Sequence, residues 1–252
     1  STNPSRGYET IDSVHVSTTE EVQEAVNRAQ ASLPEWRTLS VEERVRYFET
    51  LKEVFESRIE DIARLQSQEM GKPITQSRKE VAGVLSRMQW HMEHAPEILA
   101  PRELDDMGEF VTELHFEPHG VAAVIAPWNF PTSLFMVGTT MLLLAGNTVV
   151  LKHSEECALT SKLLADIFAE AGFPEGVFQC IFGDGKVGEV LLEQDIDFVS
   201  FTGSSRVGEQ IYKKAAEKFI PALLEMGGSS PGIVFADVDI QKSSASVFAE
   251  GF

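Results

Sequence analysis

The sequence has few cysteines, no long apolar run and no secretory leader. Its 252 residues include only Cys157 and Cys180, far apart, which indicates a reducing compartment rather than a disulfide framework. The longest apolar stretches, residues 121–126 and 141–145, fall far short of the roughly 20 residues that a membrane span needs. The first residues lack the charged and apolar regions of a signal peptide. We therefore expect a cytoplasmic protein without a membrane partner.

Basic residues are also scarce. There are 21 Lys plus Arg against 39 Asp plus Glu, a net charge of -18. Binding to duplex nucleic acid needs a basic face that releases counterions from phosphates, so we expect no nucleic-acid partner. Hydrophobic residues make up 43% of the chain, enough for a sizeable core in one large domain or two ordinary ones.

The first part of the chain, residues 1–106, has the patterns of helices. Residues 17–20 and 40–43 both have the form of a capping box, and the second precedes an apolar stripe at helical spacing over residues 45–65. A third helix is expected over residues 77–94, ended by Pro96. Residues 109–117 then alternate in part, as in a half-buried strand, and we interpret residues 107–120 as a hairpin arm.

From residue 121 on, short apolar runs alternate with segments of helix length. The expected strands are residues 121–126, 148–151, 177–182, 198–201 and 232–235, and the expected helices are residues 132–144, 155–171, 186–192 and 205–219. This alternation predicts an α/β fold with a Rossmann-like parallel sheet, covered by helices on both faces, over residues 121–227. Ligands bind at the carboxyl ends of such strands, so we expect the chemistry there.

Two expected strands are followed by residues suited to a nucleotide. Lys152 and Glu155 could hydrogen-bond the two hydroxyls of a ribose, although an exposed ion pair worth at most about 1 kcal/mol is the alternative. Gly203 and Ser204 stand where a helix begins, so free amides would face an anion unless Ser204 only caps that helix. Residues 183–188 match G-x-G-x-x-G, a weak motif that an ordinary turn also explains.

Two further side chains could take part in catalysis. Asn129 lies on a loop stiffened by two prolines, where its amide could donate to a developing oxyanion or only satisfy its own turn. Glu225 lies in an apolar segment before a double glycine, where desolvation would favour a general base. Neither cysteine suits a nucleophile, because Cys157 follows two glutamates and Cys180 lies in an expected buried strand. Two histidine pairs resemble metal ligands only in their spacing.

Taken in order, four segments resemble the aldehyde dehydrogenase family. They are Ala-Pro-Trp-Asn-Phe-Pro at 126–131, Leu-Lys-His-Ser-Glu at 151–155, Phe-Thr-Gly-Ser at 201–204 and Leu-Glu-Met-Gly-Gly at 224–228. Residues 34–36 and 69–73 are similar to that family as well, and the resemblance extends from about residue 3 to residue 252. It implies oxidation of an aldehyde by a cysteine thiolate, hydride transfer to a nicotinamide and hydrolysis of a thioester.

The resemblance implies a role for each candidate residue. Asn129 would donate to the oxyanion, and Glu225 would be the general base. The cofactor contacts would be Lys152 and Glu155 at the adenosine ribose, Gly203 and Ser204 at the diphosphate, and Trp128 and Met226 along the pocket. The carboxylate of Glu155 would repel a 2'-phosphate, which favours NAD, whereas Lys152 beside it leaves NADP possible.

Three features depart from the family pattern. Ser229 follows the double glycine where lysine or another polar residue is usual, and His153 stands where a small residue or proline is frequent. The family's nucleophilic cysteine lies downstream of the Glu225 motif, beyond Phe252. We therefore expect an aldehyde dehydrogenase-like fold truncated before most of the catalytic domain, with residues 228–252 as the start of that domain. This chain alone is expected to be inactive.

The resemblance also implies a small-molecule aldehyde as substrate and a homo-oligomer, a dimer or a tetramer, assembled through the hairpin arm. Residues 88–92 and 96–103 look closest to the succinate-semialdehyde dehydrogenase branch. An alternative from another class is a non-catalytic dinucleotide-binding partner or regulatory subunit. A third hypothesis, an enzyme that uses Glu225 alone, predicts turnover without a further nucleophile.

Overall fold

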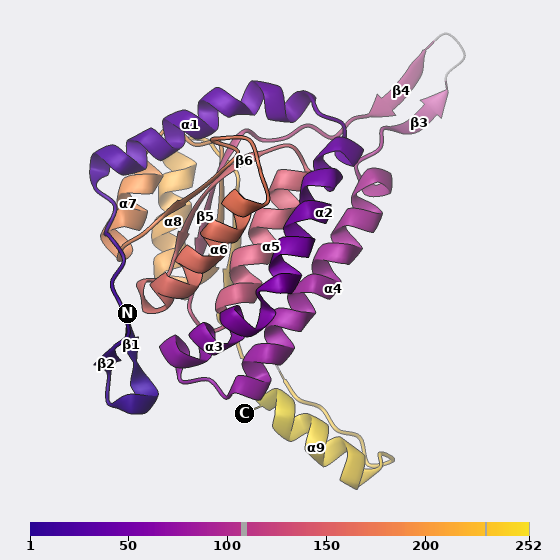
Figure 1. Ribbon diagram of the computed structural model, residues 1–252. Helices are drawn as coiled ribbons and strands as arrows, with labels where there is room; N and C mark the ends of the chain where they lie inside the picture. Colours follow the sequence, from indigo (N-terminus) through magenta and orange to yellow (C-terminus); the bar gives the residue numbers. More distant parts are fainter. Residues whose placement is uncertain (107–109, 230, 252) are drawn as a thin grey trace.

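The computed structural model describes residues 1–106, 110–229 and 231–251 (Figure 1). The chain begins with a short ribbon and a series of helices, and a hairpin projects beyond them. These elements are β1 (Thr2–Asn3), η1 (Pro4–Arg6), β2 (Glu9–Thr10), α1 (Thr19–Thr38), α2 (Val41–Ser57), α3 (Ile59–Met70), α4 (Ile74–Ile98), β3 (Arg102–Asp106) and β4 (Val111–Leu114).

A parallel sheet with strand order β7-β6-β5-β8-β9 forms the centre of the molecule. Its strands are β5 (Val121–Ala126), β6 (Thr148–His153), β7 (Phe178–Ile181), β8 (Phe198–Gly203) and β9 (Ala222–Met226). The segments that connect or follow them are α5 (Pro131–Leu144), η2 (Glu155–Cys157), α6 (Ala158–Glu170), α7 (Gly185–Glu193), α8 (Ser205–Glu217) and α9 (Ile240–Gly251). The expected α/β fold, with helices on both faces of a parallel sheet, is confirmed.

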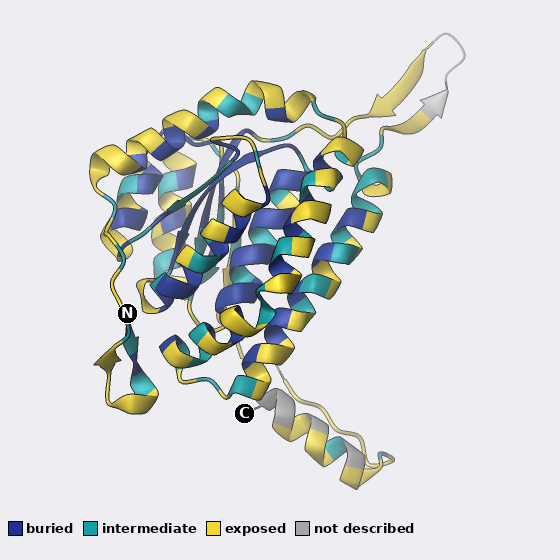
Figure 2. Ribbon diagram, viewed as in Figure 1, coloured by how far each residue is buried: buried dark blue, intermediate teal, exposed yellow. Residues whose placement is uncertain are grey.

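The two faces of the sheet bury separate apolar clusters. Successive side chains of a strand point to opposite faces. On β5, Ala122 and Val124 therefore join a cluster with helices α2 to α6, whereas Val121 and Ala123 join a second cluster with α1, α7 and α8. Figure 2 shows that the buried residues gather in the sheet and on the helix faces that meet it. No helix within the described residues is both long and apolar enough to cross a membrane.

The helical part differs from the prediction at three points. The first capping box joins Thr18 and Glu21, one residue later than expected. The apolar stripe over residues 45–65 belongs to two helices, because Arg58 between them has φ -114° and ψ 9°. The prediction that Pro96 ends the third helix is wrong. This proline lies in the last turn of α4, and the helix closes beyond it as Leu99 N–H donates to the carbonyl of Ala95 at 3.0 Å.

Two expected strands are also corrected. Residues 232–235 form no strand, and the fifth strand of the sheet is instead β9, which carries Glu225. The hairpin begins at Arg102, earlier than expected, and the residues of β4 are exposed rather than half-buried. The expected strand would have begun at Glu109, which lies outside the described residues. Both errors have one cause, since an apolar run in the sequence does not say which strand it will pair with.

Candidate active site and cofactor groove

The predicted site residues lie at the carboxyl edge of four neighbouring strands. Lys152 stands near the end of β6, and the Asn129 loop follows β5 directly. On the other side of β5, Gly203 ends β8 and pairs in register with Met226 of β9, whose preceding residue is Glu225. Trp128 and Ser204 are the neighbours of Asn129 and Gly203 in the chain. The structure therefore brings residues that are about a hundred positions apart to one edge of one sheet.

Lys152 and Glu155 form an asymmetric ion pair. The ammonium Nζ lies 3.3 Å from Glu155 Oε2, the lysine side chain is 6% exposed, and the glutamate side chain is 50% exposed. Ser154 between them caps the short η2 helix by accepting from the amide of Glu156 at 3.3 Å. The expected alternative, a fully exposed ion pair, does not describe a buried lysine. The pair instead combines one fixed donor with one accessible carboxylate.

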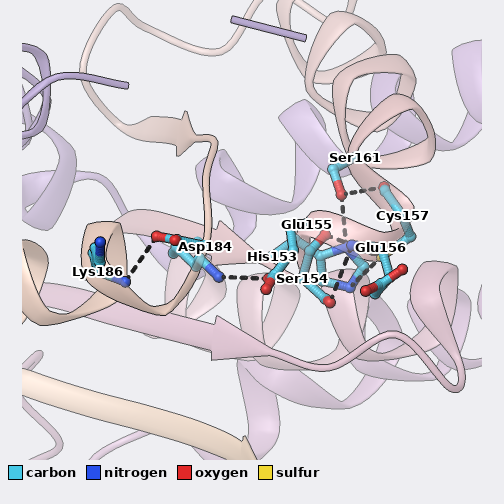
Figure 3. Close-up of polar contacts among 9 residues, drawn as sticks. His153, Ser154, Glu155, Glu156, Cys157, Ser161, Asp184 and Lys186 are labelled. Atoms are coloured by element: carbon cyan, nitrogen blue, oxygen red, sulfur yellow. Dashed lines mark hydrogen bonds and ion pairs between the residues drawn. The ribbon is translucent and has the colours of Figure 1, made fainter. Parts of the chain in front are cut away.

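His153, the departure from the family pattern, is buried behind this turn. Its Nδ1 lies 2.6 Å from Ser161 Oγ and 3.0 Å from Cys157 Sγ, as Figure 3 shows. Burial, together with the charge of Lys152, lowers the pKa of His153 to about 3, so the ring is neutral at ordinary pH. This neutral imidazole links the end of β6 to the start of α6, and it adds no charge to the turn that carries Lys152 and Glu155.

Glu69 of α3 stabilises the segment that follows this turn, at the start of α6. Its two carboxylate oxygens accept from the backbone amides of Leu159 at 2.8 Å and Thr160 at 2.7 Å, and also from the Thr160 hydroxyl at 2.5 Å. These amides belong to the first turn of α6, where no residue within the helix can accept from them. A buried carboxylate there also meets the positive end of the helix dipole. In the sequence, Glu69 belongs to a segment that resembles the family, but nothing there indicates this contact.

Lys72 and Glu80 hold the Asn129 loop. The Lys72 ammonium lies 2.6 Å from Glu80 Oε2, donates to the carbonyl of Asn129 at 3.1 Å and stands 4.3 Å from the centre of the Phe130 ring. Glu80 Oε1 accepts from the Ser133 amide at 3.0 Å, in the first turn of α5, whose N-cap residue makes no side-chain cap. Asn129 itself is exposed. The loop is therefore held by Lys72 and Glu80, while the Asn129 amide is accessible to solvent.

At the start of α8, Ser204 caps the helix, and free backbone amides remain for an anion. Its hydroxyl accepts from the Val207 amide at 3.4 Å, which is a helix cap. The other amides of that first turn stay available to an anion. Gly203 must be glycine, because a Cβ there would lie 2.5 Å from the Phe201 ring. In the turn at 183–188, by contrast, the Asp184 carboxylate already caps α7, accepting from the Lys186 amide at 2.9 Å, and its charge disfavours a phosphate.

A groove of 560 Å³ opens between α7 and α8, beside Lys152. Its volume falls in the usual range of roughly 300–1,000 Å³ for small-molecule sites. Apolar side chains of Ile125, Leu192, Val207 and Ile211 contribute to its walls, and charged residues of both helices border it. An aromatic ring bound between the helices would be close to Lys152, whereas Glu155 borders a neighbouring hollow with Gly183 and Asp184. The size and the apolar walls of the groove are compatible with the adenosine end of a dinucleotide.

The remaining expectations concern single side chains. Glu225 and Met226 are exposed on the edge strand β9, so the expected desolvation of Glu225 is not found among the described residues. Burial raises the pKa of both thiols, Cys157 and Cys180, and so disfavours the thiolate that a nucleophile needs. In the described parts of the chain, no three His, Cys, Asp or Glu side chains gather as a metal site.

Comparison with known proteins agrees with this arrangement. The model of the aldehyde dehydrogenase family matches residues 1–252. The chain is 34% identical to the alpha-ketoglutaric semialdehyde dehydrogenase of Bacillus subtilis (strain 168), over 99% of this chain and 52% of that protein. It is 33% identical to the NAD(P)+ succinate semialdehyde dehydrogenase Sad of Escherichia coli (strain K12), over 96% of this chain and 52% of that protein.

The solved structure of PnpE in complex with nicotinamide adenine dinucleotide superposes with a TM-score of 0.89 at 30% identity, covering 94% of this chain and 49% of that one. This chain thus spans about half the length of the curated relatives that it matches. A family match over the whole length of the chain and a shared fold lead to one conclusion. The chain belongs to the aldehyde dehydrogenase family.

Proposed function

We propose that this chain provides the cofactor site, the oxyanion donor and the general base of an NAD(P)-dependent aldehyde dehydrogenase. The observation that carries the proposal is the meeting of Lys152, Asn129, Gly203 and Glu225 at one edge of the sheet. The two named relatives act, by their names, on semialdehydes that bear a carboxylate. The proposed substrate is therefore a small aldehyde of that class, such as succinate semialdehyde.

The cofactor would lie along this edge. Lys152 and Glu155 would hydrogen-bond the adenosine ribose, and the α8 amides beside Gly203 and Ser204 would face the diphosphate. Trp128 and Met226, both half-exposed, would border the nicotinamide end. The accessible carboxylate of Glu155 would oppose a 2'-phosphate, so NAD is the proposed cofactor, with NADP second. When bound, the nicotinamide would take up the hydride from the substrate.

Side chains of this chain would stabilise the oxyanion and accept the proton of the attacking water. The Asn129 amide would donate to the oxyanion that forms on the aldehyde oxygen, and the loop contacts of Lys72 would keep it in place. Glu225 would take a proton from the attacking water. Because neither cysteine of this chain suits a nucleophile, the attacking thiolate is proposed to come from the rest of a longer enzyme.

The division of the chain follows the same proposal. Residues 1–106 and 121–227 would form the cofactor domain, residues 107–120 the oligomerisation arm, and residues 228–252 the start of the catalytic domain. Exposed apolar side chains at Phe110 and Val111 on the hairpin support pairing with another subunit, as do the unpaired edges of this ribbon. We propose a homo-oligomer in the cytoplasm.

Two measurements test the proposal. Calorimetry should detect NAD binding to the 252-residue chain, and the full-length gene product should oxidise succinate semialdehyde with NAD. Asn129→Ala should lower kcat about 100-fold, as loss of one oxyanion donor does elsewhere. Asn27→Ala on the exposed side of α1 is the matched control. Binding without turnover in the full-length product would favour the alternative, a non-catalytic dinucleotide-binding subunit, and the absence of both would contradict the proposal.

A further inference from the structure

Arg87 on α4 is a guanidinium without a carboxylate partner. Its Nη2 donates to the Ser133 hydroxyl at 2.8 Å, and across the described ranges no acidic side chain lies within ion-pair distance of it. In a chain of net charge -18, most other arginines are ion-paired, for example Arg58 with Asp61 and Glu170. The side chain is also exposed, so its charge is accessible from outside.

Arg87 lies next to the Asn129 loop. Glu80 and Arg87 are seven residues apart on α4, hence on one face of that helix, and both contact Ser133, through its amide and its hydroxyl respectively. Glu80 also pairs with Lys72, which donates to the carbonyl of Asn129, so one carboxylate holds both Ser133 and the Asn129 loop. The guanidinium, which donates to Ser133, therefore lies beside the contacts that hold the proposed oxyanion donor.

The geometry points to Arg87 as the residue that binds the distal carboxylate of the aldehyde substrate, an assignment that rests on the proposed function. One donor of the guanidinium is engaged with Ser133, and the remaining donors can form a two-point contact with a carboxylate. The chain's negative charge would otherwise repel such a substrate. Lys72, the other cation near the loop, is already neutralised by Glu80.

The inner side of Arg87 is not where this carboxylate would bind. A hollow of about 10 Å³ lies between Arg87, His91 and Val137, enough for one water at most and too small for a substrate. His91 has a buried Nδ1 without a hydrogen-bond partner among the described residues. The carboxylate would therefore approach the exposed side of the guanidinium, and its aldehyde end would extend toward Asn129.

A pair of aldehydes of equal length tests this assignment in the full-length gene product. Succinate semialdehyde carries the distal carboxylate, whereas butanal has the same number of carbons without it. In Arg87→Leu, the ratio of kcat/KM for succinate semialdehyde to that for butanal should fall about 10- to 100-fold, the usual range for a lost hydrogen bond to a charged group. Arg87→Lys should recover part of the ratio, because it keeps the charge but loses the planar fork.

Arg46→Leu is the matched control, since Arg46 is exposed on α2 and has no ion pair within the described residues. This variant should leave kcat/KM for both aldehydes unchanged. An equal loss for both aldehydes in Arg87→Leu would show a structural role and overturn the assignment, and so would an unchanged ratio. A wild-type product that oxidises neither aldehyde would instead overturn the proposed function, so the two failures are distinct.

Discussion

Lys72→Met should destabilise the chain strongly, because it leaves the buried Glu80 carboxylate without the cation that pairs with it. In the wild type, the Lys72 and Glu80 side chains are 14% and 3% exposed, with 2.6 Å between Nζ and Oε2. Removing one partner of a buried pair costs about 3–5 kcal/mol, because a buried charge is left unpaired. The Gln66 amide and the Ser133 backbone still donate to Glu80, so we expect a loss near the lower limit, about 3 kcal/mol.

Urea unfolding of the 252-residue chain measures this loss, because the free energy of unfolding falls linearly with denaturant. Lys162→Met is the control, since Lys162 pairs with Asp166 at a similar 2.7 Å but with both side chains about half exposed. We expect it to cost no more than about 0.5 kcal/mol. Adding Glu80→Gln to Lys72→Met should recover part of the stability, since no buried charge remains. Equal losses in Lys72→Met and Lys162→Met would refute the reasoning.

Three further predictions concern the ribose turn. Burial lowers the pKa of His153 from 6.5 to about 3, so below pH 6.5 the unfolded chain takes up a proton that the folded chain does not. The free energy of unfolding should therefore fall by up to about 1.4 kcal/mol per pH unit from pH 6 to pH 4 through this residue, and urea titrations of His153→Gln should lack that share of the slope. Glu69→Gln should cost about 1–2 kcal/mol in urea unfolding by weakening the charged cap of α6, while the exposed Glu156→Gln should cost much less, and equal losses would count against the cap. Glu155→Gln should raise the affinity for NADP relative to NAD in calorimetry, and an unchanged ratio would mean that this carboxylate does not face the 2'-phosphate.

The sequence was sufficient for those features that depend on neighbours in the chain. Four of the five sheet strands follow from apolar runs between helical segments, and Asn129, Lys152, Glu155, Gly203 and Ser204 follow from their place after strand ends. Lys152 and Asn129 are found in this way because a parallel sheet gathers its carboxyl ends at one edge. No knowledge of distant contacts is needed for that step.

The residues behind the site could not be found in this way. Glu69 and Glu80 lie in α3 and α4, where a charged residue in an amphipathic helix gives no sign of burial, and Lys72 lies in the turn between these helices. Their roles appear only when α3 and α4 pack against the starts of α6 and α5. The exposure of Glu225 has the same origin, since its apolar neighbours in sequence say nothing of what covers the edge strand. Long-range packing therefore explains both what was missed and what was wrong.

Because the sheet separates the two apolar clusters, substitutions in one cluster can be chosen largely without regard to substitutions in the other. The groove between α7 and α8 includes Ile125, Val207 and Ile211 and belongs to the cluster of α1, α7 and α8, whereas Phe48 and Phe135 lie in the other cluster. Changes on opposite sides of a rigid layer, without shared contacts, add with little coupling. Substitutions at apolar positions of the α2 to α6 cluster that do not contact Glu69 or η2 can therefore be selected for heat tolerance separately from changes in the groove, and the gains can be combined in one chain.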